Sequence, residues 1–129
     1  IFDLTQLILT KKIDQARDLV KDLTLQGEDE IKLIAIMLGQ FRLYTQVKIL
    51  QESGQTESQM VSSLGHYLGR NPNPYQIKFA LRDTRGLSLN FLQDSIRYLI
   101  QADYQIKTGV YEKGYLFEKA LLQIASQSN

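Results

Sequence analysis

Side chains that could carry out chemistry are few in this chain, and they form no recognisable catalytic set. The 129 residues contain no cysteine, and His66 is the one histidine. No serine has a histidine at a plausible spacing, no two carboxylates lie along an apolar stretch, and no glycine-rich phosphate loop precedes a lysine. A metal site needs several His, Cys or acidic ligands brought together. We therefore expect no catalytic centre, no metal site, no cofactor and no other small-molecule ligand.

The segment 56–85 has the one pattern that is typical of a DNA-binding motif. A short helix, a turn and a second helix over residues 74–85 resemble a helix-turn-helix. The basic residues of the second helix and its end are Lys78, Arg82 and Arg85. The connection, a loop expected over residues 66–73 with His66 at the surface, is longer than this motif normally allows. The second helix is either a DNA-binding helix or part of the core, and its mostly apolar side chains favour the core.

Charged and aromatic side chains gather in a helix expected from about Ser88 to Lys107. Asp103 falls on its apolar face, and Lys107 follows at i+4, the favourable orientation for an ion pair. Either Asp103 forms a local, partly buried pair or caps the end of a neighbouring helix, which we favour, or Asp103 meets a partner subunit. Aromatic residues surrounded by polar groups are typical of protein interfaces. The hypothesis is therefore a subunit interface formed by Tyr98, Asp103, Tyr104 and Lys107.

The last connection, residues 108–114, carries Tyr111 and Lys113 between two glycines. Tyr111 falls outside the apolar pattern of the final helix, and by this pattern alone its side chain would be exposed. The alternative is that Tyr111 folds over the end of that helix and packs on Leu116 or Tyr115. We favour the packed arrangement.

The helices that position these segments are organised around residues 28–53. On a helix of about 3.6 residues per turn, apolar side chains cover nearly the whole circumference. They leave one narrow stripe of Lys32, Gly39 and Gln46. A helix of this kind is normally buried on most sides. Glycine inside a helix costs about 1 kcal/mol relative to alanine, so we expect a neighbouring helix to approach Gly39 closely.

Capping signals divide the rest of the chain into further helices. The expected helix-starting residues are Asp3, Thr56, Asn73 and Ser88, and the expected stops are Gly27, Gly54, Gly65 and Gly109. The tail from Ser126 is expected to fray. No strand alternation occurs, so the predicted fold class is all-α, a compact bundle of about six to seven helices around the buried helix 28–53. We expect residues 1–129 to form a single domain.

Net charge and hydropathy indicate which partners and which cellular location to expect for the chain. The formal net charge is +1, which gives no field strong enough to indicate a polyanion partner. No apolar run reaches the length of a membrane span, and the first residues are not a basic leader. We expect a cytoplasmic protein with no membrane contact. The absence of an initial methionine suggests a fragment of a longer protein.

Four sequence blocks in register resemble one known family. They read FDLTQLIL, EIKLIAIMLGQFRLYTQVKIL, NPYQIKFAL and QADYQIKTG, and they extend from Phe2 to about Ile124. Their order and spacing are similar to those in the C-terminal domain of the bacterial DNA polymerase III delta subunit, a clamp-loader family. No single block is specific to this family, whereas the combination of the four is.

The resemblance implies a role in replication. In this family the clamp loader opens the ring-shaped sliding clamp and places it on primed DNA, as part of the DNA-directed DNA polymerase III holoenzyme. The C-terminal domains of the pentameric loader form a helical collar, and ATP is hydrolysed by other subunits. The resemblance therefore implies a non-catalytic scaffold domain. Its expected partners are clamp-loader subunits of the tau/gamma and delta-prime types.

The resemblance also allows the connection 108–114 to face DNA, because the collar caps the chamber that holds the primer–template end. An exposed tyrosine can stack on an unpaired or terminal base, and a lysine can contact a phosphate. Tyr111 and Lys113 are therefore candidates for contacts with primed DNA.

Overall fold

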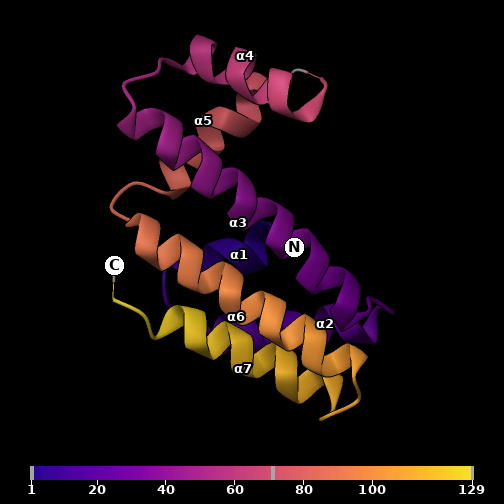
Figure 1. The fold of residues 1–129 in the computed structure, drawn as a ribbon. Coiled ribbons are helices and arrows are strands. Elements are labelled where there is room, and N and C mark those ends of the chain that lie inside the picture. Colours follow the sequence, from indigo (N-terminus) through magenta and orange to yellow (C-terminus); the bar gives the residue numbers. More distant parts are fainter. Residues whose placement is uncertain (1, 71, 129) are drawn as a thin grey trace.

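A computed structural model describes residues 2–70 and 72–128, and within these ranges the chain forms seven α-helices and no strand. In chain order they are α1 (Phe2–Leu9), α2 (Ile13–Leu25), α3 (Glu30–Glu52), α4 (Glu57–Leu68), α5 (Pro74–Asp83), α6 (Leu89–Lys107) and α7 (Lys113–Ala125). The prediction of an all-α fold is confirmed. Figure 1 shows α3 running along the whole assembly of helices.

Helix α3 is the central element, as its apolar circumference predicts. It packs against α4, α5, α6 and α7, and Thr5 of α1 donates a hydrogen bond to its buried Gln40. The buried side chains of α3 are Leu33, Ile34, Met37, Leu38, Gln40, Phe41, Tyr44 and Val47. Its first turn is capped by Asp29, whose carboxylate accepts a hydrogen bond of 2.7 Å from the Ile31 N–H. The prediction of a buried central helix is confirmed.

The other helices gather around the two parts of α3. Helices α4 and α5 lie near its C-terminal part, and α1, α2, α6 and α7 lie together on one side of the remainder (Figure 1). A hydrogen bond of 3.0 Å joins the Tyr44 hydroxyl of α3 to the Asp83 carboxylate at the end of α5. Helix α6 packs on both α3 and α7. One side of α6 is therefore covered by α3 and α7, and the other side, which we call its outer side, is exposed to solvent.

Most predicted helix ends are confirmed, and two are wrong. Thr56 and Gln59 form the expected capping box, and Asn73 and Ser88 cap α5 and α6. Helix α1 already begins at Phe2, so Asp3 lies in its first turn and is not its cap. Gly65 does not end α4, because a helix interior tolerates glycine at a cost of about 1 kcal/mol.

Helix α4 instead continues to Leu68 and ends at Gly69, whose φ of 78° is left-handed. His66 is exposed, as expected, but it lies in the last helical turn and not in a loop. The connection to α5 is therefore residues 69–73, shorter than the loop predicted over residues 66–73.

Two further expectations about packing are wrong. A side-chain carbon added at Gly39 would meet no atom within 4 Å, because this residue lies on the exposed side of α3. No described helix of the chain therefore approaches it. The tail expected to fray over residues 126–129 is held at Gln127, because the Gln127 amide donates to Ser95 at 2.8 Å and Lys11 donates to the Gln127 carbonyl at 2.6 Å. Asn129 lies outside the described residues.

Helix α3 is long and apolar enough to cross a membrane by length and composition, and it is the one such helix in the described part of the chain. The sequence prediction rested on uninterrupted apolar runs and did not single it out. The helices packed around α3 give a physical reason for its composition, because a helix covered on most sides needs apolar side chains on most sides.

Candidate interaction site

The C-terminal half of α6 carries three of the four predicted interface residues on its outer side. The Lys107 ammonium lies 2.9 Å from the Asp103 carboxylate, the predicted i, i+4 ion pair, and both side chains reach solvent. Tyr104 lies at i−3 from Lys107, on the neighbouring part of the same face. Its side chain is 66% exposed. The structure therefore brings these three residues together.

Tyr98 lies on a different side of α6 from this group. Tyr98 and Lys107 are nine positions apart, which at about 100° per residue places them on opposite sides of a helix. Tyr98 is half-buried against the core, and the Arg97 guanidinium lies 5.7 Å from the centre of its ring. The expectation that Tyr98 lies beside Asp103 and Lys107 is therefore not met.

Ile100 completes the outer face and was missed from the sequence. It is 46% exposed and lies at i−4 from Tyr104, so the two side chains are neighbours on the helix surface. The sequence signal was ambiguous, because Ile100 lies at i+4 from Ile96 and i+8 from the buried Leu92, spacings that belong to an apolar stripe. We call Ile100, Asp103, Tyr104 and Lys107 the α6 patch. It combines exposed apolar surface with a charged pair.

The two predicted DNA-contact residues lie at the start of α7. Tyr111 is 61% exposed, and its ring contacts that of Tyr115 edge to face at 5.8 Å. It thus combines both expected arrangements, exposure and packing on Tyr115. Lys113 is the first residue of α7, and its ammonium lies 3.2 Å from the Asp29 carboxylate at the start of α3. A phosphate would have to compete with this ion pair.

The outer face of α5 carries aromatic as well as basic side chains. Tyr75 and Phe79 are exposed, one helical turn apart. The Arg82 guanidinium lies 4.9 Å from the centre of the Phe79 ring, and it also contacts the Asp83 carboxylate at 3.2 Å. This face therefore has the basic charge that a DNA-binding helix needs. It also carries two exposed aromatic rings at positions where such a helix would have polar side chains that read base edges.

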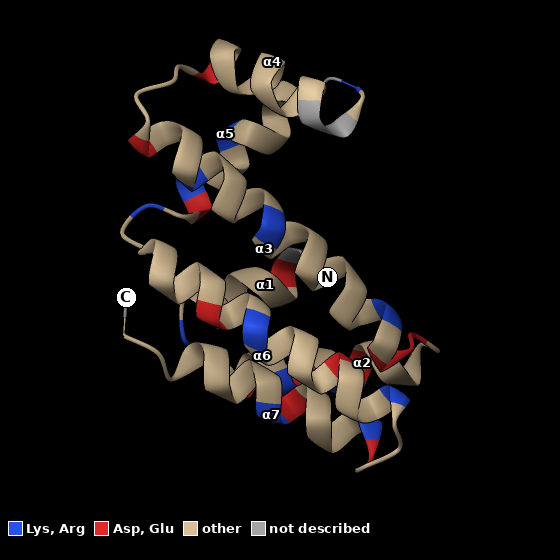
Figure 2. Ribbon diagram, in the orientation of Figure 1, with Lys and Arg blue, Asp and Glu red and all other residues tan. Residues whose placement is uncertain are grey.

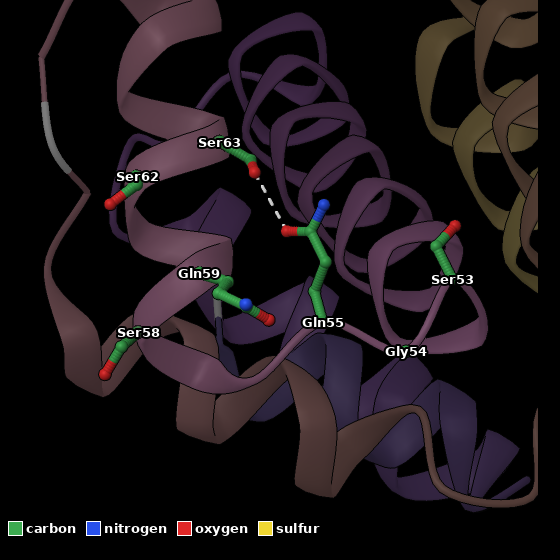
Figure 3. A pocket seen from close by; sticks show the side chains of 7 residues that line it. All are labelled: Ser53, Gly54, Gln55, Ser58, Gln59, Ser62 and Ser63. Carbon is green, nitrogen blue, oxygen red and sulfur yellow. Dashed lines mark hydrogen bonds between the residues drawn. The ribbon is translucent and has the colours of Figure 1, made fainter.

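A shallow pocket of about 600 Å³ lies where α3 ends and α4 begins (Figure 3). Its lining residues are Ser53, Gly54, Gln55, Ser58, Gln59, Ser62 and Ser63. The Ser63 hydroxyl donates to the Gln55 side-chain oxygen at 2.8 Å, while Ser58 and Ser62 point away from Gln55 (Figure 3). The lining offers hydroxyl and amide groups without a charge, so it brings together no acid, base or nucleophile pair.

A second groove of about 820 Å³ lies between α2 and α7. Its acidic lining residues are Asp14, Asp18, Glu30, Glu112 and Glu118. Arg17 crosses the groove and pairs with Glu118 at 2.7 Å. Within residues 2–70 and 72–128, no three His, Cys or acidic residues are close enough together to hold a metal ion. Among the described residues, the ion pair of Arg17 and Glu118 is the one recorded between charges that line this groove.

The side chain with the most strongly shifted pKa, Tyr44, lies at the contact between α3 and α5. Burial raises the pKa of the Tyr44 hydroxyl, and the neighbouring Asp83 carboxylate raises it further. The tyrosine therefore remains protonated and donates to Asp83 at any physiological pH. Its role is to hold α5 on α3.

Comparisons with known proteins agree on one family. Residues 1–124 match the family described as DNA polymerase III delta subunit, C-terminal domain. The DNA polymerase III subunit delta of Bacillus subtilis (strain 168) is 33% identical over 128 residues, which cover 99% of this chain and 35% of that protein. The solved structure of the Bacillus subtilis DNA clamp loader delta protein has a TM-score of 0.83 at 32% identity, covering 98% of this chain and 35% of that one.

The chain thus spans about a third of the length of these relatives. The matched region, residues 1–124, includes α1 to α6 and nearly all of α7. The chain therefore belongs to the family formed by the C-terminal domains of DNA polymerase III delta subunits.

Proposed function

We propose that this chain is the collar domain of a replicative clamp-loader subunit. It holds the pentameric loader together so that the loader can place the sliding clamp on primed DNA. The observation that carries the proposal is the family match over residues 1–124. Its partners are the collar domains of tau/gamma-type and delta-prime-type subunits.

The α6 patch is the first surface that we assign to a neighbouring subunit. Tyr104 and Ile100 supply exposed apolar area, and the pair of Asp103 and Lys107 supplies the polar edge. A tyrosine surrounded by polar groups is a common centre of binding energy at interfaces. Tyr98 is not part of this surface, because it packs against the core from another side of α6.

Pairwise binding to the separately purified neighbours tests this assignment. Tyr104→Ala should weaken the affinity for one neighbour by about tenfold or more and leave the melting temperature unchanged. Tyr75→Ala is the matched control, because Tyr75 on α5 is equally exposed, at 66%. Equal affinities for the Tyr104 variant and the unchanged subunit would remove the α6 patch from the interface. A failure of the unchanged subunit to bind any neighbour would contradict the collar role itself.

The proposed role is non-catalytic. The sequence contains no glycine-rich loop with a following lysine, the arrangement whose backbone N–H groups hold a triphosphate. Calorimetric titration of the 129-residue chain with ATP and Mg²⁺ should therefore give no saturable heat. Saturable binding would show that the chain has a nucleotide site.

Tyr111 is the residue that we assign to primed DNA, because its ring is largely exposed at the start of α7. Stacking on a terminal or unpaired base is worth about 1–3 kcal/mol. Tyr111→Ala should therefore weaken binding of the reconstituted loader to primed DNA without changing the melting temperature. A lower melting temperature with unchanged DNA affinity would assign Tyr111 to packing on Tyr115. Lys113→Ala should reduce the salt dependence of binding if its ammonium leaves Asp29 for a phosphate.

The second candidate function is duplex binding through α5, favoured by the exposed Lys78 and Arg82. We rank it below the collar role, because Tyr75 and Phe79 occupy the same face and read no base edge. Fluorescence anisotropy with labelled duplexes separates the two. Sequence-dependent binding that Lys78→Ala abolishes would support the second candidate.

A further inference from the structure

The segment that follows α7 is tied through Gln127 to two other parts of the molecule. The Lys11 ammonium, in the turn between α1 and α2, donates to the Gln127 main-chain carbonyl at 2.6 Å. The Gln127 side-chain amide donates to the Ser95 hydroxyl of α6 at 2.8 Å. We call Lys11, Ser95 and Gln127 the tail latch. Its two hydrogen bonds join segments that are 116 and 32 positions apart in the chain.

Lys11 occupies a backbone position that normally favours glycine. Its φ of 61° is left-handed, and it is the one non-glycine residue with a positive φ in the described part of the chain. The Lys11 N–H donates to the Ile8 carbonyl at 3.1 Å and the Lys12 N–H donates to the Leu7 carbonyl at 2.8 Å, the Schellman pattern of a helix end. A left-handed backbone is unfavourable for a residue with a side chain. The hydrogen bond from the lysine side chain to Gln127 compensates for this cost.

The position of the Lys11 ammonium also suits the end of α7. That helix has no basic residue in its last turn, although the C-terminal end of a helix carries partial negative charge. Lys11 and Lys12 form a basic stretch between α1 and α2 (Figure 2). Lys11 forms no ion pair with a carboxylate among the described residues. Its ammonium therefore supplies the cation for the end of α7 from another element.

The tail beyond α7 has few other contacts. Ser126 and Ser128 are exposed, and the last fully buried side chain before them is Ile124. Chain ends that are held by a few polar contacts open at low free energy. Ser95, in contrast, is fully buried, and its hydroxyl also donates to the Phe91 carbonyl at 2.7 Å. Opening of the tail would therefore uncover Ser95 without breaking the hydrogen bond that this hydroxyl makes within α6.

We propose that residues 126–128 form a strap that opens and closes over Ser95, and that the Lys11 ammonium holds the strap closed. This inference does not depend on the proposed collar function, because it concerns contacts within the chain. In the closed state, the strap ties the turn between α1 and α2 to α6 and α7. In the open state, the left-handed backbone of Lys11 loses the contact that compensates for its cost.

Amide hydrogen exchange, measured by NMR on the 129-residue chain, tests the proposal. The N–H groups of Ser126 and Gln127 report on the closed strap, because they donate to main-chain carbonyls of α7. Lys11→Met keeps the apolar stem of the side chain and removes the ammonium. It should accelerate exchange of both amides by about two- to tenfold, the range expected for one hydrogen bond. Lys12→Met, at the exposed neighbouring position, is the matched control and should leave their exchange unchanged.

Lys11→Gly separates the side chain from the backbone. It should open the strap as far as Lys11→Met does, but melt at a higher temperature, because glycine adopts the left-handed conformation without strain. If the Ser126 and Gln127 amides exchange as slowly in both Lys11 variants as in the unchanged chain, Lys11 does not hold the tail. Equally accelerated exchange throughout α6 and α7 in Lys11→Met would mean that the contact stabilises the whole domain and that no separate strap exists.

Discussion

At the scale of single residues, Gln40 is a buried polar group with incomplete hydrogen bonding. Its side-chain oxygen accepts a hydrogen bond from Thr5, while its side-chain nitrogen has no partner among the residues that the structure describes. A buried donor without a partner costs about 1–3 kcal/mol. The hydrogen bond from Thr5 therefore joins α1 to α3, while the unpaired amide nitrogen of Gln40 lowers the stability of the core.

We predict that Gln40→Leu keeps the free energy of unfolding unchanged or raises it by up to about 1 kcal/mol. The lost hydrogen bond from Thr5 is offset, because the unpaired amide nitrogen is removed from the core. Urea denaturation measures the change. A loss above about 1 kcal/mol would mean that the Gln40 amide nitrogen has a partner in solution, such as a bound water.

Asp29 links the pH dependence of stability to the start of α3. The hydrogen bond from the Ile31 N–H lowers the pKa of Asp29, and the hydrogen bond from the Lys113 side chain lowers it further. The unfolded chain therefore takes up a proton at a higher pH than the folded chain does. Asp29 contributes its full stabilisation above its ordinary pKa of 3.8, and that contribution is lost as the pH falls through the lower folded pKa.

The Asp29→Asn variant isolates this effect, because asparagine can still accept the Ile31 hydrogen bond without titrating. The difference in melting temperature between the unchanged protein and this variant should shrink as the pH is lowered through and below 3.8, the ordinary pKa of Asp29. An unchanged difference over that pH range would show that the Asp29 carboxylate has the same pKa in the folded and unfolded chains.

At the scale of elements, α3 combines a buried face and an exposed face that respond to substitution in opposite directions. Phe41 is fully buried, and Phe41→Ala should lower the free energy of unfolding by about 3–5 kcal/mol. Leu38→Ala should lower it by about 2–5 kcal/mol. Gly39→Ala should raise it by up to about 1 kcal/mol. Chemical denaturation of the three variants tests which face of α3 is buried. A loss of stability in Gly39→Ala would mean that the exposed face of α3 has a contact at Gly39.

The attachment of α5 to α3 depends on the hydrogen bond from Tyr44 to Asp83. Tyr44→Phe should lower the free energy of unfolding by about 1–3 kcal/mol, since Asp83 loses a donor in a largely buried position. Hydrogen exchange of the α5 amides should accelerate more than that of the α6 amides. Tyr75→Phe is the control, because the Tyr75 ring is exposed. Equal acceleration in both helices would mean that α5 does not open independently of α6.

The sequence was sufficient to predict the elements but not all of their boundaries or neighbours. Apolar periodicity and caps such as Thr56, Asn73 and Ser88 are local signals, and the structure confirms them. Gly65 was misassigned because a glycine inside a helix and a glycine that ends one look alike in sequence. They differ in backbone conformation, and here Gly69 has the left-handed φ.

The same limit applies to the candidate sites. The spacing of Asp103 and Lys107 predicted their ion pair correctly, because it depends on helix geometry alone. The separation of Tyr98 from Lys107 also follows from helix geometry alone, because nine positions place the two residues on opposite sides of α6. The absence of a neighbour at Gly39, by contrast, is a property of the packed helices, as is the ion pair between Lys113 and Asp29.

At the scale of the whole molecule, the central claim is that this chain holds a clamp loader together. The most direct measurement is native mass spectrometry of the reconstituted loader. The full-length delta-type subunit is compared with a shortened form that lacks the segment formed by residues 1–129 of this chain. Circular dichroism confirms beforehand that the shortened subunit remains folded. If these residues hold the loader together, the intact subunit should give a stoichiometric pentamer and the shortened subunit should not be incorporated. A full pentamer that contains the shortened form would contradict this claim.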